Sequence, residues 1–372
     1  MIPDHEQHLA CRASGSRACG ATGTPTIEDA IGFDALMESA QLCMRNVMWK
    51  GTTAWFAMHL TEEVSRLCDE LHDGTYQMRK CREFPITYPK PRIISSVAFR
   101  DRVVQRSFND HIIYPIMSRS WVYDNYACQH GKGTDFARQR MRCHLERHLR
   151  THGETGAILQ VDVRGYYDNM RHDYVNARFA EKLPAFAADF ARDVLAWQYR
   201  GDKGYHPGSQ MVQIAGVDYL DPLDHHIKEG LGIRGYGRYM DDFVLMHEDV
   251  GHLRECLALI ADRLACVGLE PHPRKTHIRP IEDGLTFLGF QYRVQGGKVR
   301  MHVDPSKVKD QRRHLSGLAR LVRDGRMTTE DYLQALGCIL EHDGKGCSHA
   351  LVTRMEEYGM TRLKEALNEH QD

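Results

Sequence analysis

The 372-residue sequence has no apolar run that approaches the ~20 consecutive residues of a membrane-spanning helix. Its N-terminus also lacks the charged segment followed by an apolar one that marks a secretory signal. Residues 1–26 end in a stretch rich in Gly, Ser and Thr, and we expect them to form a flexible lead. These absences favour a cytoplasmic protein with no membrane partner.

No Cys-x-x-C pair occurs among the eleven cysteines, and no group of Cys and His residues has zinc-finger spacing. Reduced and mostly buried thiols are therefore expected, in place of disulfides or a zinc site. Cys11 and Cys19 form the only close pair outside the expected fold. Two residues alone cannot complete a tetrahedral zinc site.

The sequence lacks the overall positive charge of many nucleic-acid binders, since its net charge is −1. The charges are unevenly distributed, however. Residues 79–150 contain fifteen Lys and Arg against six Asp and Glu, and residues 298–326 contain nine against three. Phosphate binding depends on the local field, so these stretches are compatible with a groove for a polyanion. A solvated charged face remains the alternative for each stretch taken alone.

Helical and extended segments alternate along the chain, which predicts an α+β fold packed as one body. Three prolines oppose a helix in the extended segment 84–94, and Thr134 is the expected N-cap of a basic helix to Arg150. The remaining predicted elements are two helices in 27–73, a helix over 101–115, a strand at 157–163, a helical segment to 199, a helix at 211–229, a hairpin at 235–247, a helix at 251–267, strands at 276–278, 286–292 and 298–303, and helices from 305 onward.

The strongest feature is the segment Arg238-Tyr-Met-Asp-Asp-Phe-Val-Leu245. Its apolar flanks favour strands, which places Asp241 and Asp242 at a strand-to-strand turn. Two adjacent anions at a turn are costly unless a cation neutralises them. Mg²⁺ prefers carboxylate, phosphate and water oxygens, so an Asp pair on a rigid hairpin suits it.

A second acidic residue, Asp162, ends the predicted strand at 157–163. If this strand lies beside the hairpin, Asp162 and Asp241 can hold two metal ions for in-line phosphoryl transfer. One ion then activates a 3′-hydroxyl and the other stabilises the leaving pyrophosphate. A bare Asp-Asp pair is usually a solvated turn, so the interpretation depends on the whole tetrad and on Asp162.

Four segments resemble motifs of bacterial reverse transcriptases. Residues 160–168, Gln-Val-Asp-Val-Arg-Gly-Tyr-Tyr-Asp, resemble the first palm motif, and Tyr239-Met-Asp-Asp242 resembles the catalytic tetrad. Residues 126–134, Tyr-Ala-Cys-Gln-His-Gly-Lys-Gly-Thr, resemble a fingers motif. Residues 287–290, which are Phe287, Leu288, Gly289 and Phe290, resemble the segment that grips the primer. The resemblances follow the family order and span about Phe33 to Val303.

This resemblance implies a right-hand polymerase fold with fingers, a palm of antiparallel sheet plus helices, and a helical thumb. The expected boundaries are 27–156 for the fingers with the start of the palm, 157–292 for the palm, and 293–372 for the primer-grip end and the thumb. Duplexes containing RNA are read largely by shape and backbone. Thumb arginines at 312, 313, 320 and 323 would suit such a duplex.

The resemblance also assigns catalytic roles. Asp162, Asp241 and Asp242 would be the catalytic carboxylates, with Asp242 the weakest candidate for a direct metal ligand. Val163 completes the expected metal set, which holds two Mg²⁺ ions, with Mn²⁺ as an alternative. Lys275 falls where the family has a lysine near the pyrophosphate, as a candidate proton donor.

The implied nucleotide-binding residues are Lys90, Arg92 and Arg102 near the triphosphate, Tyr167 under the sugar, and Gly208 and Gln213 before the long palm helix. An aromatic side chain at Tyr167 would exclude a 2′-hydroxyl and so favour deoxynucleotides. Its alternative is a core tyrosine, and the alternative for the basic residues is a solvated surface. Val212 replaces the small hydroxyl residue of the family motif at 207–213, which weakens the assignment of Gly208 and Gln213.

The resulting hypothesis is an RNA-directed DNA polymerase that uses a primer, an RNA or DNA template and dNTPs. Met240 and the altered run at 207–213 resemble the uncharacterised and defence-associated bacterial group more than intron or retron enzymes. That group implies antiphage defence, a structured noncoding RNA, and a second reverse transcriptase or homo-oligomer. The alternatives are a diversity-generating retroelement polymerase with an accessory protein, and a catalytically silent RNA-binding scaffold.

Overall fold

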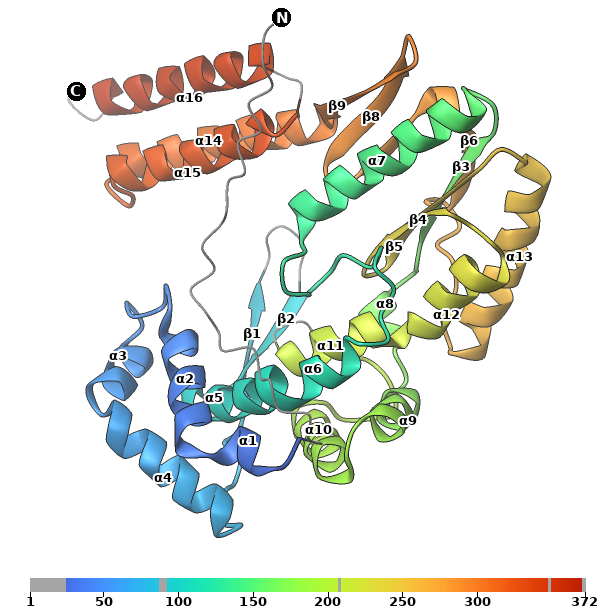
Figure 1. Ribbon diagram of the computed structural model, residues 1–372. Helices are drawn as coiled ribbons and strands as arrows, with labels where there is room; N and C mark the ends of the chain where they lie inside the picture. Colours follow the sequence, from blue (N-terminus) through green and yellow to red (C-terminus); the bar gives the residue numbers. More distant parts are fainter. Residues whose placement is uncertain (1–24, 87–91, 207–208, 347–348, 370–372) are drawn as a thin grey trace, which may run out of the picture.

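The computed structural model describes residues 25–86, 92–206, 209–346 and 349–369 (Figure 1). The expected lead at 1–26 therefore lies outside the described residues except for its last two. Helices from the first part of the chain lie at the lower left of Figure 1, the central sheet at the right, and the C-terminal helices at the upper left. Nowhere in the described ranges does a helix have the length and apolarity needed to cross a membrane.

The N-terminal region is helical, with one two-stranded antiparallel ribbon. Two helices were predicted over 27–73, and this described range contains four. Gly32 adopts an extended conformation that ends the first, and residues 45–50 separate the second from the third. The elements are α1 (Glu28–Ile31), α2 (Phe33–Met44), α3 (Gly51–Met58), α4 (Leu60–His72), β1 (Arg82–Ile86), β2 (Arg92–Ser96), α5 (Phe99–Phe108), the π-helix η1 (Asn109–Ile113) and α6 (Tyr114–Met117).

A four-stranded antiparallel sheet forms the centre of the molecule. Its strands are β3 (Ala157–Asp162), β4 (Gly235–Tyr239), β5 (Asp242–His247) and β6 (His277–Pro280), in the order β4-β5-β3-β6. The predicted hairpin is thus present as β4-β5, and the predicted strand ending at Asp162 lies directly beside it. This antiparallel sheet with helices confirms the α+β fold.

Helices cover the sheet and connect its strands. They are α7 (Thr134–His152), α8 (Tyr166–Asn169), α9 (His172–Lys182), α10 (Ala185–Gln198), α11 (Gln210–Tyr219), α12 (Asp221–His225), the π-helix η2 (His226–Gly230) and α13 (Val250–Cys266). Two predictions were wrong in detail. Gly133, not Thr134, is the N-cap of α7, and the helix expected over 211–229 is broken into α11, α12 and η2.

The two faces of the sheet pack against different elements, because successive strand residues point to opposite sides. Leu159 and Phe243 join the large core that includes α13. Ile158 and Val244 join a second core with α7. Even-numbered positions of β3 and β5, including Asp162, therefore face the α7 side.

A second, three-stranded sheet and three helices complete the chain. The sheet contains β7 (Leu285–Phe287), β8 (Phe290–Gln295) and β9 (Lys298–Val303), preceded by the 3₁₀ turn η3 (Ile281–Asp283). One strand was predicted over 286–292, but the turn at Leu288-Gly289, with φ of 48° and 82°, divides it. The helices α14 (Pro305–Arg323), α15 (Thr329–Gly344) and α16 (His349–Glu369) enclose their own apolar core.

Candidate active site

A two-residue turn joins β4 to β5 and carries the first acidic residue of the tetrad. Tyr239 pairs with Asp242 across the hairpin, which leaves Met240 and Asp241 in the turn. Met240 has φ of 57°, a left-handed conformation that costs a residue with a side chain about 1–3 kcal/mol and is concentrated at functional sites. The Val163 N–H donates to the Asp241 carbonyl at 3.1 Å, so the turn is tied to the end of β3.

Three acidic residues lie at this end of the sheet. Asp162 and Asp242 are direct register partners on β3 and β5, and Asp241 precedes Asp242 in the turn. Burial raises the pKa of Asp241, and the charge of Asp162 raises it further. Burial likewise raises the pKa of Asp242 to about 7, with added repulsion from Asp241 and Asp162. The site therefore holds more negative charge than its environment can stabilise without a cation.

Lys275 supplies one cation to this cluster. It lies in the connection between α13 and β6, and its Nζ is 3.0 Å from Asp162 Oδ1 and 2.8 Å from Oδ2. Asp162 itself is anchored through its carbonyl, which accepts the His272 N–H at 2.7 Å. The sequence resemblance placed Lys275 near the pyrophosphate. In the structure it contacts Asp162, one of the candidate catalytic residues.

Gln160 was quoted within a motif but given no role from the sequence. Its side-chain Nε2 donates to Asp242 Oδ1 at 3.3 Å and to the Thr286 carbonyl at 3.0 Å. Asp242 is thus engaged by an amide, while Asp162 is engaged by Lys275. Strand periodicity could have indicated Gln160, because it lies two residues before Asp162 and shares its face.

A buried ion pair supports the hairpin from beneath. Arg238 and Asp224 are both fully buried, with contacts of 2.6 Å and 2.7 Å between the guanidinium and the carboxylate. Arg238 Nη1 also donates to the Met240 carbonyl at 2.9 Å, and Tyr236 donates its hydroxyl to Asp224. The pair therefore fixes the strained turn. Sequence reasoning missed it, since no local pattern links α12 to β4.

Tyr167 lies beside the turn. Its hydroxyl is 3.5 Å from Met240 Sδ, and its ring is partly buried. Gly216 on α11 makes room for it, because a Cβ at that position would lie 3.0 Å from the Tyr167 hydroxyl and 3.1 Å from Cε1. The tyrosine is therefore at the edge of the site and only in part a core residue.

The other nucleotide-binding candidates are not all gathered at the acidic cluster. Lys90 and Gly208 lie outside the described residues, and Arg92 begins β2. Arg102 directs its guanidinium toward the Val97 carbonyl, at 3.4 Å. Gln213 is exposed on α11 and lines a pocket of about 280 Å³, whose other lining residues include Arg106, Lys132 and Gln210.

The primer-grip candidates form the β7-β8 hairpin. Phe287 and Phe290 are buried, and the Arg138 guanidinium lies 4.7 Å above the Phe290 ring. Leu288 and Gly289 form the turn and are partly exposed. The rings thus hold the hairpin in place, and the turn is the part available for contact. Through Gln160, this hairpin is linked to Asp242.

The donor atoms around the cluster are oxygens, which fits a hard divalent cation better than zinc. Within the described part of the chain, no three side chains of His, Cys, Asp or Glu converge as a metal cage. Mg²⁺ sites that act on phosphates commonly use one or two carboxylates with substrate oxygens and waters. Asp162 and Asp241 have the chemistry for such a site. The backbone oxygen of Val163 is the further candidate ligand.

Together, the antiparallel sheet and the acidic residues at its adjacent strand ends have the arrangement that the sequence resemblance predicts. Residues 87–292 match the family model described as reverse transcriptase (RNA-dependent DNA polymerase). This range is more than half of the chain, and the protein belongs to the reverse transcriptase family. None of the curated proteins matches the chain.

Solved structures also match. One is telomerase from Candida albicans in complex with a TWJ fragment of telomeric RNA, with a TM-score of 0.46 and 12% sequence identity. The match covers 86% of this chain and 65% of the telomerase chain, so the protein spans less than two thirds of that chain's length.

Proposed function

We propose that this protein is an RNA-directed DNA polymerase that adds deoxynucleotides to a primer 3′-hydroxyl. The observation that carries the proposal is that Asp162, Asp241 and Asp242 lie at one end of the sheet, where burial raises the pKa values of Asp241 and Asp242. A family of RNA-dependent DNA polymerases supplies the reaction class.

In this proposal, Asp162 and Asp241 hold two Mg²⁺ ions, with Mn²⁺ as an alternative, and Val163 contributes backbone oxygen. When bound, such ions supply charge neutralisation and activation of a hydroxyl. Lys275 is held at Asp162 and can deliver a proton near the leaving pyrophosphate. Tyr167 at the edge of the turn excludes ribonucleotides. Asp242 accepts a hydrogen bond from the Gln160 side chain, orients the turn and adds negative charge.

The fingers, palm and thumb follow the boundaries proposed from the sequence: 27–156, 157–292 and 293–372. In this division the two-stranded ribbon β1-β2 belongs to the fingers, where Lys90 and Arg92 would clasp the triphosphate, with Arg102 as a further candidate. Gly208 and Gln213 would contact the nucleotide from the start of α11. The β7-β8 turn would grip the primer.

Incorporation of labelled dNTPs by the purified protein tests the proposal. The wild type is assayed with an RNA template annealed to a DNA primer and with Mg²⁺ or Mn²⁺, beside Asp241→Asn. We expect extension by the wild type and a loss of at least about 1000-fold in the variant, a magnitude typical for removal of an essential catalytic group. Equal incorporation by both proteins would mean that the acidic cluster is not catalytic. Absence of activity in both would favour the silent scaffold.

We also propose the biological setting, a cytoplasmic role in bacterial antiphage defence with a structured noncoding RNA. Its support is the sequence likeness of Tyr239-Met-Asp-Asp242 and residues 206–213 to defence-associated enzymes. Sequencing nucleic acid that co-purifies with the protein distinguishes the settings. One recurrent structured RNA supports defence, and a variable-repeat transcript supports a diversity-generating retroelement.

A further inference from the structure

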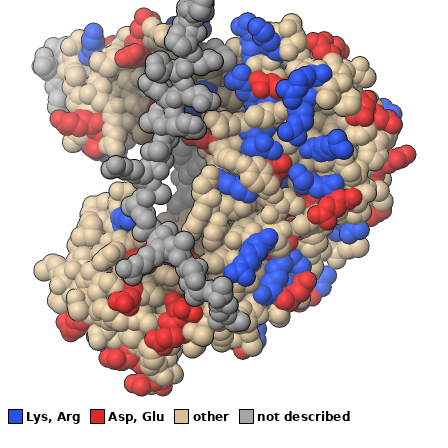
Figure 2. Space-filling model, in the orientation of Figure 1, with Lys and Arg blue, Asp and Glu red and all other residues tan. Residues whose placement is uncertain are grey.

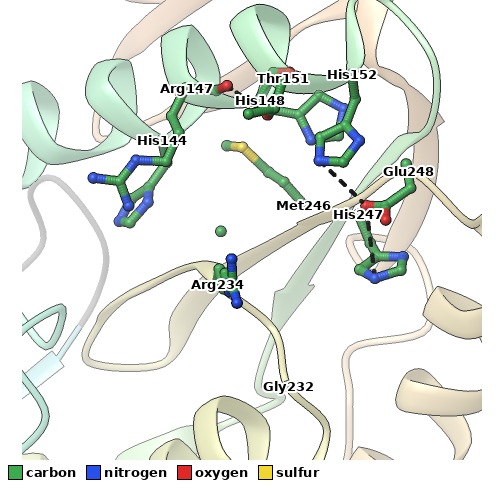
Figure 3. A pocket seen from close by; sticks show the side chains of 11 residues that line it. His144, Arg147, His148, Thr151, His152, Gly232, Arg234, Met246, His247 and Glu248 are labelled. Atoms are coloured by element: carbon green, nitrogen blue, oxygen red, sulfur yellow. Dashed lines mark hydrogen bonds and ion pairs between the residues drawn. The ribbon is translucent and has the colours of Figure 1, made fainter.

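A second polar pocket lies at the end of the central sheet, away from the acidic cluster. It has a volume of about 260 Å³ and lies between the C-terminal half of α7, the segment before β4 and the end of β5 (Figure 3). Asp242 begins β5 and His247 ends it. At about 3.4 Å per strand residue, the pocket is roughly 17 Å from the catalytic turn along this strand.

Two guanidinium groups face this pocket from opposite walls. Arg147 extends from α7, and Arg234 comes from the segment before β4 (Figure 3). Both side chains are exposed. Within residues 25–86, 92–206, 209–346 and 349–369, neither has an ion pair with a carboxylate, although Arg138, Arg140 and Arg142 on the same helix all do. Two guanidinium groups without a carboxylate partner are available to bind an anion.

The histidines around the pocket are mostly engaged with the protein. His144 Nε2 is 3.2 Å from Asp124 Oδ1, and His148 Nε2 is 2.7 Å from the Thr155 carbonyl. The described residues contain no His, Cys, Asp and Glu grouping suited to a metal ion. The pocket is therefore not a histidine metal site, and its unused groups are the arginines.

Glu248 is the acidic side chain among the residues that line this pocket. Glu248 lies 3.7 Å from His152 Nε2 and 3.7 Å from His247 Nε2. Its pKa is lowered by its own backbone N–H and then by the neighbouring histidines, so it is ionised at neutral pH. Glu248 is thus engaged on the histidine side of the pocket. The guanidinium groups of Arg147 and Arg234 therefore keep their positive charge in the pocket.

The pocket is lined in part by α7, a basic helix. Lys and Arg side chains gather over the part of the molecule where α7 lies (Figure 2). Arg150, one turn beyond Arg147, is also exposed. A solvent-open pocket with exposed arginines, continuous with a basic helix, suits one phosphate of a longer polyanion better than an enclosed small molecule.

We propose that Arg147 and Arg234 bind a backbone phosphate of an RNA segment that lies at the end of the central sheet opposite the acidic cluster. This site is separate from the catalytic cluster and does not depend on the polymerase reaction. Membership of the reverse transcriptase family makes RNA the polyanion that the protein encounters. Bidentate guanidinium contacts to phosphate need no particular base, so binding here depends on RNA shape and charge.

Fluorescence anisotropy with a labelled hairpin RNA and the full-length protein, freed of nucleic acid, tests this site. The double variant Arg147→Ala/Arg234→Ala is compared with Arg200→Ala/Arg254→Ala, which removes the same charge from exposed arginines that lie neither in the pocket nor on α7. We expect the pocket variant to bind RNA about tenfold or more weakly. Its dependence of log affinity on log salt should lose about one unit of slope or more. The control should lose less than about threefold.

Equal losses in the two double variants would overturn the proposal, because only general charge would then matter. Unchanged RNA affinity in the pocket variant would overturn it as well. Inorganic phosphate is tested separately by its effect on Tm. If it stabilises the wild type but not the pocket variant while RNA affinity is unchanged, the occupant is a small phosphate and the RNA assignment is wrong. Extension of a pre-annealed primer should remain within about twofold of wild type in the pocket variant, which separates this result from failure of the proposed polymerase activity.

Discussion

Lys275 holds its ammonium nitrogen within 3.0 Å of both carboxylate oxygens of Asp162, a residue 113 positions earlier in the chain. The pair joins the connection after α13 to the end of β3. It places a proton donor next to a carboxylate that is proposed to hold a metal ion. The acidic cluster is thus partly neutralised by the protein itself.

Replacement of this lysine should slow the chemical step. Lys275→Ala is expected to lower the rate of single-nucleotide incorporation by about 100-fold, since general acids contribute about 10²- to 10⁴-fold. Lys275→Arg keeps the charge but gives up its proton far less readily, so it should restore binding of dNTPs more than the rate. Rapid-quench measurements of rate and apparent dNTP affinity check this. A full rate in Lys275→Arg would show that the lysine only neutralises charge, and a full rate in Lys275→Ala would show that it takes no part in the reaction.

Stability should depend on pH through Asp242. Its pKa is about 7 in the folded protein, against about 3.9 in an unfolded chain. Between these values the folded state binds more protons, so the free energy of unfolding falls as pH rises from about 4 to about 7. Asp242→Asn cannot ionise and should lose this part of the slope. Urea unfolding in EDTA, from pH 5 to 8, measures the difference, and parallel curves for the two proteins would contradict the shift.

Tyr167 should control the choice of sugar. Tyr167→Ala removes the ring beside the catalytic turn, and we expect incorporation of ribonucleotides to rise by about tenfold or more relative to deoxynucleotides. Tyr166→Phe is the matched control, because that ring is buried and its hydroxyl donates to the Gly216 carbonyl. Competition between rNTP and dNTP in one reaction gives the ratio. An unchanged ratio in Tyr167→Ala would assign the tyrosine to packing.

Gly216 should matter because of Tyr167. A methyl group there would lie 3.0 Å from the Tyr167 hydroxyl, so Gly216→Ala must push the ring toward the turn or away from it. We expect a KM for dNTPs raised several-fold, with a smaller effect on stability, since α11 tolerates alanine. The double variant Gly216→Ala/Tyr167→Ala should behave like Tyr167→Ala alone. Additive effects of the two changes would place their causes in different contacts.

The buried ion pair beneath the hairpin should be costly to break on one side only. Asp224→Leu leaves the Arg238 charge buried without its partner and should destabilise the protein by about 3–5 kcal/mol. Arg238→Met should do the same, while the double variant Arg238→Met/Asp224→Leu should recover much of the loss. Chemical denaturation of the four proteins gives the coupling energy. A double variant as unstable as the sum of the singles would contradict coupling.

Much of the site was predictable because it is built from local motifs. The hairpin with Asp241 in its turn follows from strand-favouring residues on both sides of an acidic pair, and Asp162 follows from an apolar strand that ends in an acid. The structure confirms the hairpin and the strand that ends at Asp162. The helix boundaries before residue 73 and in 211–229 were not, because short breaks such as Gly32 and the π-helix η2 depend on packing that periodicity does not record.

By itself, the sequence determined the antiparallel α+β class, the hairpin, the acidic residues and the reverse transcriptase family. Each of these features depends on short motifs of neighbouring residues. Only the tertiary structure decided which distant residues act on them. Lys275 on Asp162, Gln160 between Asp242 and Thr286, and the Arg238–Asp224 pair are contacts between elements far apart in the chain. Ion pairs and hydrogen bonds depend on distances of about 3 Å, and only packing of the whole chain brings such groups that close.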